Sequence, residues 1–204
     1  MTAERERLLA LVTDPAVLQR LPEPIQLASG EMSRDFVDGK LAVDDADDLD
    51  FVGEVMVAAA RRAGAEFEAV GGLVLGAVPF VFAVAGAARC RWFLIRKEPK
   101  GRGTNRWVEG ARITAGARVM LVDDVVTTGG SIVKAYEQVV GAGAEVTFAT
   151  TLVDRGDMAA VYFAAAKVPY HPLLTYADLG IDPIGRGLTN RHTKGTNGSD
   201  SVLR

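Results

Sequence analysis

The stretch Val119–Ser131 (VMLVDDVVTTGGS) constrains the fold of this chain more than any other segment. Its first residues, Val119–Val122, are all apolar, which is typical of a strand buried on both faces of a parallel sheet. Two carboxylates, Asp123 and Asp124, follow at the expected carboxyl end of that strand, and a helix is expected over Ser131–Val140. In an open α/β sheet, ligands bind outside the carboxyl ends of the strands. The stretch therefore predicts a ligand site between a central strand and the helix that follows it.

The loop between this strand and this helix has the composition of a phosphate site. Its residues Thr127–Ser131 are small, with hydroxyl groups and glycines, so the backbone N–H groups can surround a phosphate at a helix N-terminus. Asp123 and Asp124 would repel that phosphate, and they suit the hydroxyls of a ribose or a magnesium-bound water instead. The alternative is that the aspartates end a strand and the loop only caps a helix. That alternative explains one carboxylate and one hydroxyl, but not the whole stretch. The sequence has no G-x-x-x-x-G-K-[ST] motif for a competing nucleotide site.

From Ala69 onward, apolar runs of β type alternate with helical runs. This alternation predicts an α/β fold with a mostly parallel central sheet flanked by helices. The expected strands are Ala69–Leu75, Trp92–Ile95, Val119–Val122, Val146–Val153 and His171–Thr175, and the expected helices are Pro79–Ala88, Ser131–Val140 and Met158–Ala166.

The N-terminal part, to about residue 45, is expected to form a small hood on this domain. We expect a helix over Glu4–Val12, a second short helix opened by Asp14-Pro15, and short strands over Ile25–Leu27 and Asp35–Val37. The whole domain is expected to span residues 1–184. The polar, glycine-rich tail 185–204 lacks any periodicity and is expected to be disordered.

Two segments allow a second interpretation. Ala69–Ala88 carries no charge over the length of a membrane span, but its glycines and Pro79 favour a buried strand, a turn and a buried helix. The aspartates between Asp44 and Asp50 resemble a metal site, but they precede an apolar helix that ends in Arg61-Arg62. Acidic residues at the start of a helix and basic ones at its end stabilise the helix dipole, so we favour the structural role.

Charge and cysteine content exclude some classes of protein. The net charge of −3 argues against a general nucleic-acid binder. The single cysteine, Cys90, cannot form an internal disulfide, so we expect a reducing cytoplasm. The N-terminus is charged and amphipathic, unlike a signal peptide.

A basic segment, Arg96–Arg106, lies between two expected strands. It contains five basic side chains and one acid, Glu98, and its glycines Gly101 and Gly103 favour flexibility. A solvated, charged hairpin is the ordinary interpretation of such a run. Next to a phosphate site, however, a flexible basic loop can close over a pyrophosphate, neutralise the charge on that leaving group and exclude water.

The stretch Val119–Ser131 resembles the signature of type I phosphoribosyltransferases, which bind 5-phosphoribosyl-1-pyrophosphate (PRPP). Further segments are similar to the orotate branch of that family. They are the N-terminal Leu27-Ala28-Ser29-Gly30 with Ser33, Phe36, Val37 and Asp38, the glycine-rich Val70–Ala77, the basic loop Arg96–Gly103 with Glu109-Gly110, Val153-Asp154-Arg155, and Ala177-Asp178-Leu179-Gly180.

The resemblance implies a magnesium-dependent transfer of ribose 5-phosphate from PRPP to orotate by a homodimer. Part of the basic loop is implied to reach the partner's site, and magnesium is implied to bind mainly through PRPP. Arg155 and Thr127 are implied to contact orotate; from the residues alone, a surface arginine paired with Asp154 or Asp157 is the alternative for Arg155. The implied catalytic residues are Lys97, Lys100, Arg102, Asp123 and Asp124. The implied PRPP-binding residues are these five with Arg96, Val125, Val126, Thr127, Thr128, Gly129, Gly130 and Ser131.

Three positions depart from the family pattern. Arg102 stands where the family usually has histidine, and Arg102 keeps the charge but cannot exchange a proton near neutral pH. Val78 and Asn105 replace an aspartate and a glycine that are common in the family. These changes leave open a phosphoribosyltransferase for another base. A regulator that binds PRPP without turnover is the alternative of a different class, and the basic loop favours the enzyme.

Overall fold

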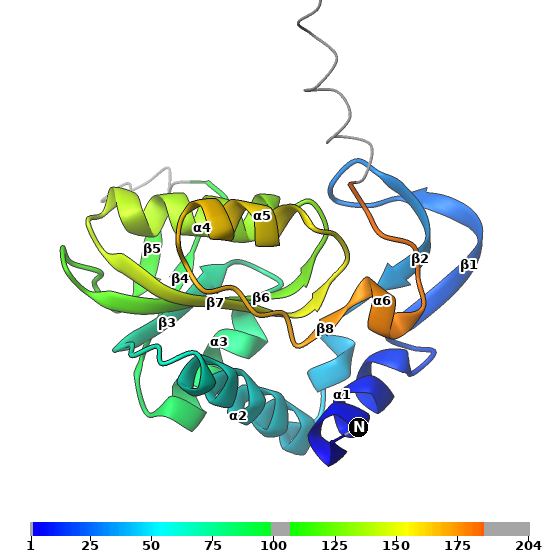
Figure 1. Cartoon of the computed structure of the whole chain (residues 1–204), viewed down its shortest axis with the longest axis horizontal. Helices are drawn as coiled ribbons and strands as arrows, with labels where there is room; N and C mark the ends of the chain where they lie inside the picture. Colours follow the sequence, from blue (N-terminus) through cyan, green and yellow to red (C-terminus); the bar gives the residue numbers. More distant parts are fainter. Residues whose placement is uncertain (1, 99–106, 186–204) are drawn as a thin grey trace, which may run out of the picture.

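A six-stranded sheet forms the middle layer of the protein (Figure 1). The computed structural model describes residues 2–98 and 107–185. The strands of the sheet are β3 (Ala69–Leu73), β4 (Arg91–Ile95), β5 (Val108–Gly110), β6 (Arg118–Val126), β7 (Glu145–Asp154) and β8 (Leu174–Thr175). Their spatial order is β5-β4-β3-β6-β7-β8, and only the edge strand β5 is antiparallel to its neighbour among these described strands. The predicted α/β architecture, with a mostly parallel sheet, is confirmed.

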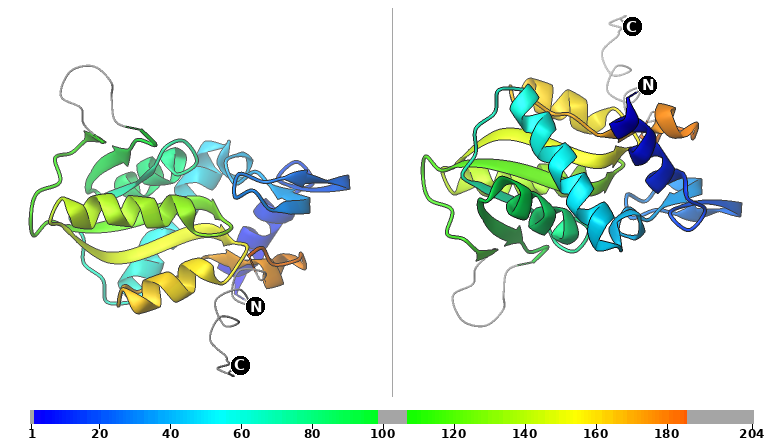
Figure 2. Two further views of the ribbon diagram at one scale, coloured as in Figure 1. Left: turned by 90° about the horizontal axis from the view of Figure 1, so that it is seen from above. Right: turned by 90° about the horizontal axis from the view of Figure 1, so that it is seen from below.

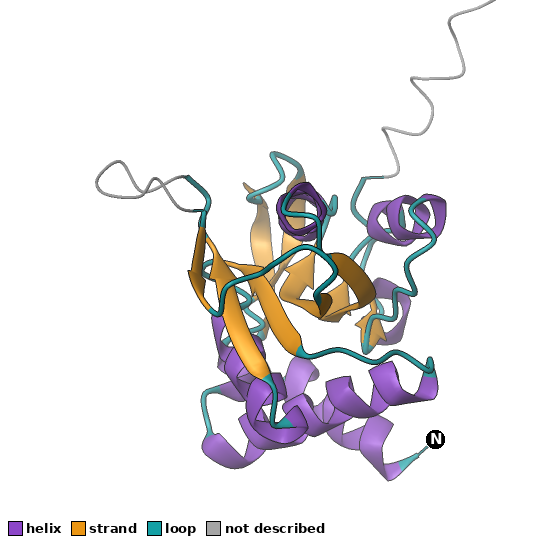
Figure 3. Ribbon diagram, turned by 90° about the vertical axis from the view of Figure 1, so that its left-hand side faces the viewer, coloured by secondary structure: helices purple, strands orange, loops and turns teal. Residues whose placement is uncertain are grey.

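Helices cover both faces of this sheet (Figure 3). One face carries α2 (Ala46–Arg62) and α3 (Val78–Ala88), and the other carries α4 (Gly130–Gly141) and α5 (Met158–Ala165). Met56 and Phe80 are completely buried on the first face, and Ile132 and Phe163 are buried on the second. Burial on both faces explains why the central strands are apolar without alternation.

The N-terminal part contributes a separate two-stranded antiparallel sheet. Strands β1 (Leu18–Gln26) and β2 (Met32–Val37) form a hairpin that projects from the body of the protein (Figure 2). The helix α1 (Ala3–Thr13) precedes the hairpin, and the short helix η1 (Leu41–Val43) follows it. The last described helix, α6 (Tyr176–Leu179), lies beside α1, where Arg5 and Asp178 form an ion pair.

The expected second helix at Asp14-Pro15 is wrong. The N–H groups of Val17 and Leu18 both donate to the Asp14 carbonyl, which makes a turn that leads directly into β1. Pro22 and Pro24 exclude a continuing helix, and prolines are tolerated in edge strands such as β1. The short strand expected over Asp35–Val37 is part of the longer β2, and the one expected over Ile25–Leu27 overlaps the end of β1 at Ile25 and Gln26.

The strands of the main sheet differ from the expectation at several places. Strand β6 extends to Val126, so Asp123 and Asp124 lie within the strand rather than beyond its end. The edge strand β5 was not expected, because it is short and contains Glu109 and Gly110. Pairing with β4 stabilises β5. The strand expected over His171–Thr175 is reduced to the two residues of β8.

The uncharged segment Ala69–Ala88 folds as a buried strand and a buried helix, as expected. Gly71 in β3 allows the Phe93 ring to pack against it, because a Cβ at Gly71 would lie 2.2 Å from Phe93 Cε2. No helix in the described part of the chain is long and apolar enough to cross a membrane. The acidic run also has the expected structural role, since the Asp45 side chain caps the first turn of α2 and Arg61 and Arg62 lie in its last turn.

Candidate active site

The loop that joins β6 to α4 presents an open helix N-terminus. Gly129 adopts a φ of +81°, a left-handed conformation that favours glycine. No side chain of the described residues caps the N-terminus of α4. The first backbone N–H groups of a helix have no partner within the helix, and here they remain available for an anion.

Asp123 is buried next to this loop and is held by two donors. It is 3% exposed; the Ser131 hydroxyl donates to its Oδ2, and the Asp124 N–H donates to its Oδ1 at 3.0 Å. Burial, and then the charge of Asp124, raise the pKa of Asp123 to about 7. A carboxyl group that titrates near neutral pH can both accept a hydrogen bond from a hydroxyl and donate one to it.

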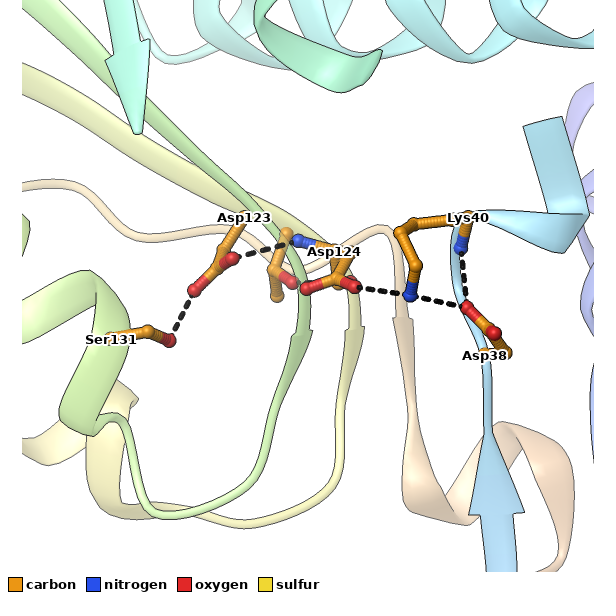
Figure 4. A network of polar contacts seen from close by, with 6 residues as sticks. Asp38, Lys40, Asp123, Asp124 and Ser131 are labelled. Carbon is orange, nitrogen blue, oxygen red and sulfur yellow. Dashed lines mark hydrogen bonds and ion pairs between the residues drawn. The ribbon is translucent and has the colours of Figure 1, made fainter. Parts of the chain in front are cut away.

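Asp124 occupies a tight position between three segments. The Thr151 hydroxyl on β7 donates to the Asp124 carbonyl at 2.8 Å. A Cβ on Gly76, in the loop after β3, would lie 2.3 Å from Asp124 Oδ1. On its other side, Lys40 Nζ lies 3.9 Å from Asp124 Oδ2 (Figure 4). The carboxylate of Asp124 therefore lies between the backbone at Gly76 and the side chain of Lys40.

A cavity of about 360 Å³ lies at the carboxyl ends of β3 and β6 and includes both aspartates. One wall is apolar, from the β1–β2 hairpin and the loop after β3. Lys40 and Lys97 supply positive charge at the cavity lining. A cavity lined by both apolar side chains and acidic and hydroxyl groups suits a ligand that combines a heterocycle with a ribose phosphate. The apolar wall consists of Leu27, Ala28, Phe36, Val37, Leu73 and Leu75.

Arg155 lines the same cavity from the end of β7, and it is only 1% exposed. Its guanidinium donates to the Asp35 carbonyl at 2.8 Å and to the Ser33 hydroxyl at 3.0 Å, both on β2. Its Nε has no hydrogen-bond partner among the described atoms. Burial lowers the pKa of Arg155, and the charge of Asp35 opposes this effect. The alternative of a surface arginine paired with Asp154 or Asp157 is wrong.

The turn that carries Arg155 is itself fixed by a buried carboxyl. Asp154 Oδ1 accepts from the Gly156 N–H at 3.0 Å, and Asp154 Oδ2 accepts from the Tyr170 hydroxyl at 2.8 Å. Burial raises the pKa of Asp154 to about 6. These bonds hold the backbone of the turn in one conformation, so Arg155 points toward the hairpin and the cavity.

The structure brings most of the predicted site residues together. Asp123, Asp124, Val125, Thr127, Ser131, Lys97 and Arg155 all line the cavity. Thr128 and Gly129 lie in the turn before α4, and Gly130 is the first residue of that helix.

Two predicted site residues point elsewhere, and two cannot be placed. Val126 is buried in the core, and its carbonyl accepts from the Arg155 N–H at 2.7 Å. Arg96 contacts Glu109 on β5 at 3.5 Å. Lys100 and Arg102 lie outside the described residues, as does the tail from residue 186.

The sequence did not indicate that Lys40 lines this cavity. It also did not indicate that Phe36, Leu75 and Gly76 do so. Phe36 and Val37 were part of a recognisable segment, but nothing in the sequence placed that segment against the phosphate loop. Lys40 stands alone in a loop and carries no motif of its own.

Comparison with known proteins identifies the family. A family model described as "Phosphoribosyl transferase domain" matches residues 52–168, which is more than half of the chain. The chain belongs to the phosphoribosyltransferase family.

Several similar phosphoribosyltransferases are named for orotate. The orotate phosphoribosyltransferase of Streptomyces avermitilis is 39% identical over 184 residues, which cover 87% of this chain and 98% of that protein. The one from Methanothermobacter thermautotrophicus is 37% identical over 174 residues, covering 85% and 93%. The crystal structure of Mycobacterium tuberculosis orotate phosphoribosyltransferase in complex with PRPP superposes with a TM-score of 0.69, at 31% identity, over 87% of this chain and 99% of that one.

Proposed function

We propose that this chain is an orotate phosphoribosyltransferase, which transfers ribose 5-phosphate from PRPP to orotate and releases pyrophosphate. One observation carries the proposal. A single cavity is lined by Asp123 and Asp124, by the loop at an open helix N-terminus, by apolar side chains and by the buried Arg155. We also propose that residues 1–184 form one phosphoribosyltransferase domain, and a reducing cytoplasm suits its free Cys90.

Each part of PRPP has a matching group in the cavity. The backbone N–H groups from Thr127 to Ser131 bind the 5′-phosphate at the N-terminus of α4. Asp123 and Asp124 accept hydrogen bonds from the ribose hydroxyls. Lys97 contacts the pyrophosphate, and Lys100 and Arg102, beyond the described residues, are proposed to join it.

The base binds on the opposite side of the cavity. The face of orotate packs on the apolar wall around Phe36, and its carboxylate approaches Arg155, whose Nε is without a partner. Charge-assisted hydrogen bonds from a guanidinium are among the stronger polar contacts in proteins. The Thr127 hydroxyl provides a further polar contact for the base.

The reaction replaces the bond from ribose C1 to pyrophosphate with a bond from C1 to a ring nitrogen of orotate. The N–H bond of that nitrogen breaks as well, and the released pyrophosphate or water takes up its proton. Positive charge develops on the ribose as the old bond breaks, and the negative charge of Asp124 stabilises it. The pyrophosphate leaves with more negative charge than it had as a substituent, and the basic side chains neutralise that charge. Both effects lower the barrier without any covalent intermediate with the protein.

Magnesium fits this site only as a partner of the substrate. The described residues contain no group of three or more His, Cys, Asp or Glu side chains that could hold a metal by themselves. Asp123 and Asp124 provide two carboxylates, and magnesium commonly takes one or two carboxylates with waters and substrate phosphate oxygens. When bound, magnesium supplies charge neutralisation to the pyrophosphate.

The test of the acceptor is a pyrophosphate-release assay with PRPP, magnesium and a panel of bases. Orotate is expected to react at least about tenfold better than uracil, because a charged hydrogen bond contributes on the order of 1.5–3 kcal/mol. Arg155→Ala should erase most of this preference. Arg155 also anchors the β1–β2 hairpin, so Ser33→Ala is the matched control. It removes one of the bonds that tie Arg155 to β2 but keeps the cation, and should largely preserve the preference for orotate.

Two results of this assay would contradict the proposal. If another base reacts and orotate does not, the chain is a phosphoribosyltransferase with a different acceptor. If PRPP binds but no base releases pyrophosphate, the chain is a PRPP-binding regulator.

A homodimer is part of the proposal, and an exposed aromatic pair supports it. Phe82 on α3 and Trp92 on β4 are 43% and 38% exposed, and their ring centroids lie 5.0 Å apart. Trp92 belongs to the strand that leads into the basic segment, and the family resemblance places that segment at a partner's site. Phe82→Glu should therefore convert a dimer into a monomer in sedimentation velocity. Val161→Glu, at an exposed apolar position on α5, should not. A monomeric wild-type protein at micromolar concentration would refute the dimer.

A further inference from the structure

The segment that follows the β1–β2 hairpin packs directly against Asp124. A Cβ on Gly39 would lie 3.1 Å from Asp124 Cβ and 3.1 Å from Val125 Cγ2. Glycine suits this close approach to β6, because a Cβ here would require its neighbours to shift by a few tenths of an ångström. The residues around Gly39 are therefore held at a fixed distance from the ribose-binding carboxylate.

Lys40 joins two carboxylates across this contact (Figure 4). Its Nζ lies 2.5 Å from Asp38 Oδ1 and 3.9 Å from Asp124 Oδ2. The Lys40 backbone N–H also donates to Asp38 Oδ1, at 3.3 Å. Asp38 thus fixes both the backbone and the ammonium group of Lys40, and the ammonium is directed toward Asp124.

The two neighbouring aspartates have separate means of support. Side chains of successive residues in a strand point to opposite faces, so the carboxylates of Asp123 and Asp124 diverge. Ser131 on α4 holds Asp123. Among the described residues, Lys40 is the cationic residue whose side chain lies within ion-pair distance of the Asp124 carboxylate. The other cationic side chains of the cavity are Lys97 and Arg155, and the Arg155 guanidinium is bonded to β2.

We propose that Lys40 is a positioning residue for the phosphoribosyl transfer, which holds the Asp124 carboxylate toward the ribose. The inference rests on the proposed function. Lys40 follows Phe36 closely in the sequence, and Phe36 contributes to the apolar wall on which the base is proposed to pack. The ribose site and the base site are therefore linked through the Asp38–Lys40–Asp124 contacts. Both PRPP and the nucleotide product carry the ribose phosphate, so Lys40 supports the binding of both.

The test compares Lys40→Gln with Lys40→Arg and with a matched control, Lys167→Gln. Lys167 is an exposed lysine after α5 and does not line this cavity. Calorimetry measures the affinity of each protein for PRPP and for orotidine 5′-phosphate. Lys40→Gln should weaken both by about five- to tenfold, since the ion pair is partly exposed. Lys40→Arg should recover most of the loss, and Lys167→Gln should match the wild type.

A second variant, Asp38→Asn, keeps the Lys40 charge and the acceptor oxygen at position 38, and removes the negative charge that attracts the ammonium. Asp38→Asn should weaken the binding of PRPP and of orotidine 5′-phosphate to the same extent, and by less than Lys40→Gln does. If Lys40→Gln fails to fold, Asp38→Asn still tests the role of Lys40. Unchanged affinities in Lys40→Gln, while the wild type binds PRPP, would overturn the role of Lys40 alone. A loss for PRPP without a loss for the nucleotide would also overturn it, because it would place Lys40 on the pyrophosphate. A wild type that does not bind PRPP would overturn the proposed function itself.

Discussion

Replacing Thr128 with glutamate is expected to abolish PRPP binding while the protein remains folded. Thr128 lies in the turn between β6 and α4 and is only partly buried, so a longer side chain can be accommodated. A carboxylate at this position would compete with the phosphate for the same N–H groups and would repel it. The fold should not suffer, since negative charge at a helix N-terminus is stabilising.

The matched control for this change is Thr128→Gln, which has the same shape as glutamate without the charge. We expect Thr128→Glu to lose at least about 100-fold in PRPP affinity, on the order of 3 kcal/mol, and Thr128→Gln to lose much less. Calorimetry measures both affinities, and thermal unfolding checks the fold. If the glutamate variant binds PRPP as well as the wild type does, the 5′-phosphate does not bind at this loop.

The phosphate loop could be predicted because all of its signals are contiguous in the sequence. An apolar run, two aspartates, a loop of small residues and a helix follow one another between Val119 and Ser131. Each of these patterns predicts the structure of adjacent residues only. In strand–loop–helix units, such loops lie at the carboxyl ends of the strands. The same locality explains why the parallel sheet and the caps of α2 were correctly expected.

The hairpin side of the cavity could not be predicted, because long-range contacts create it. Arg155 bonds to Ser33, which is 122 positions away in the sequence. Lys40 approaches Asp124 only because Gly39 packs on β6. No local sequence pattern predicts which loops come into contact. The role of an isolated lysine such as Lys40 therefore cannot be predicted until the fold is known. The turn at Asp14 shows the same limit, since a helix-capping pattern there begins a strand that pairs with β2.

Gly76→Ala is expected to lower turnover by about 100-fold with little change in stability. A Cβ at this position would lie 2.3 Å from Oδ1 and 2.7 Å from Oδ2 of Asp124. Gly76 does not have a positive φ, so alanine fits its backbone. The atoms in the way belong to the end of a side chain, which can rotate, so the contact should be relieved by displacement of the Asp124 carboxylate. A displacement of about 1 Å in an active site can cost on the order of 100-fold in rate.

The matched control is Gly86→Ala in α3, where a Cβ would meet no atom within 4 Å. Alanine is the better helix former, by roughly 1 kcal/mol, so this variant should be slightly more stable than the wild type and fully active. Steady-state kinetics with PRPP and orotate measure turnover for both variants, and thermal unfolding compares their stability. The combination expected for Gly76→Ala is a folded protein with almost no turnover, because only the Asp124 carboxylate is displaced. Full activity in Gly76→Ala would show that the reaction does not depend on the position of the Asp124 carboxylate. In that case Asp123, which Ser131 holds independently of Gly76, would be the carboxylate that binds the ribose.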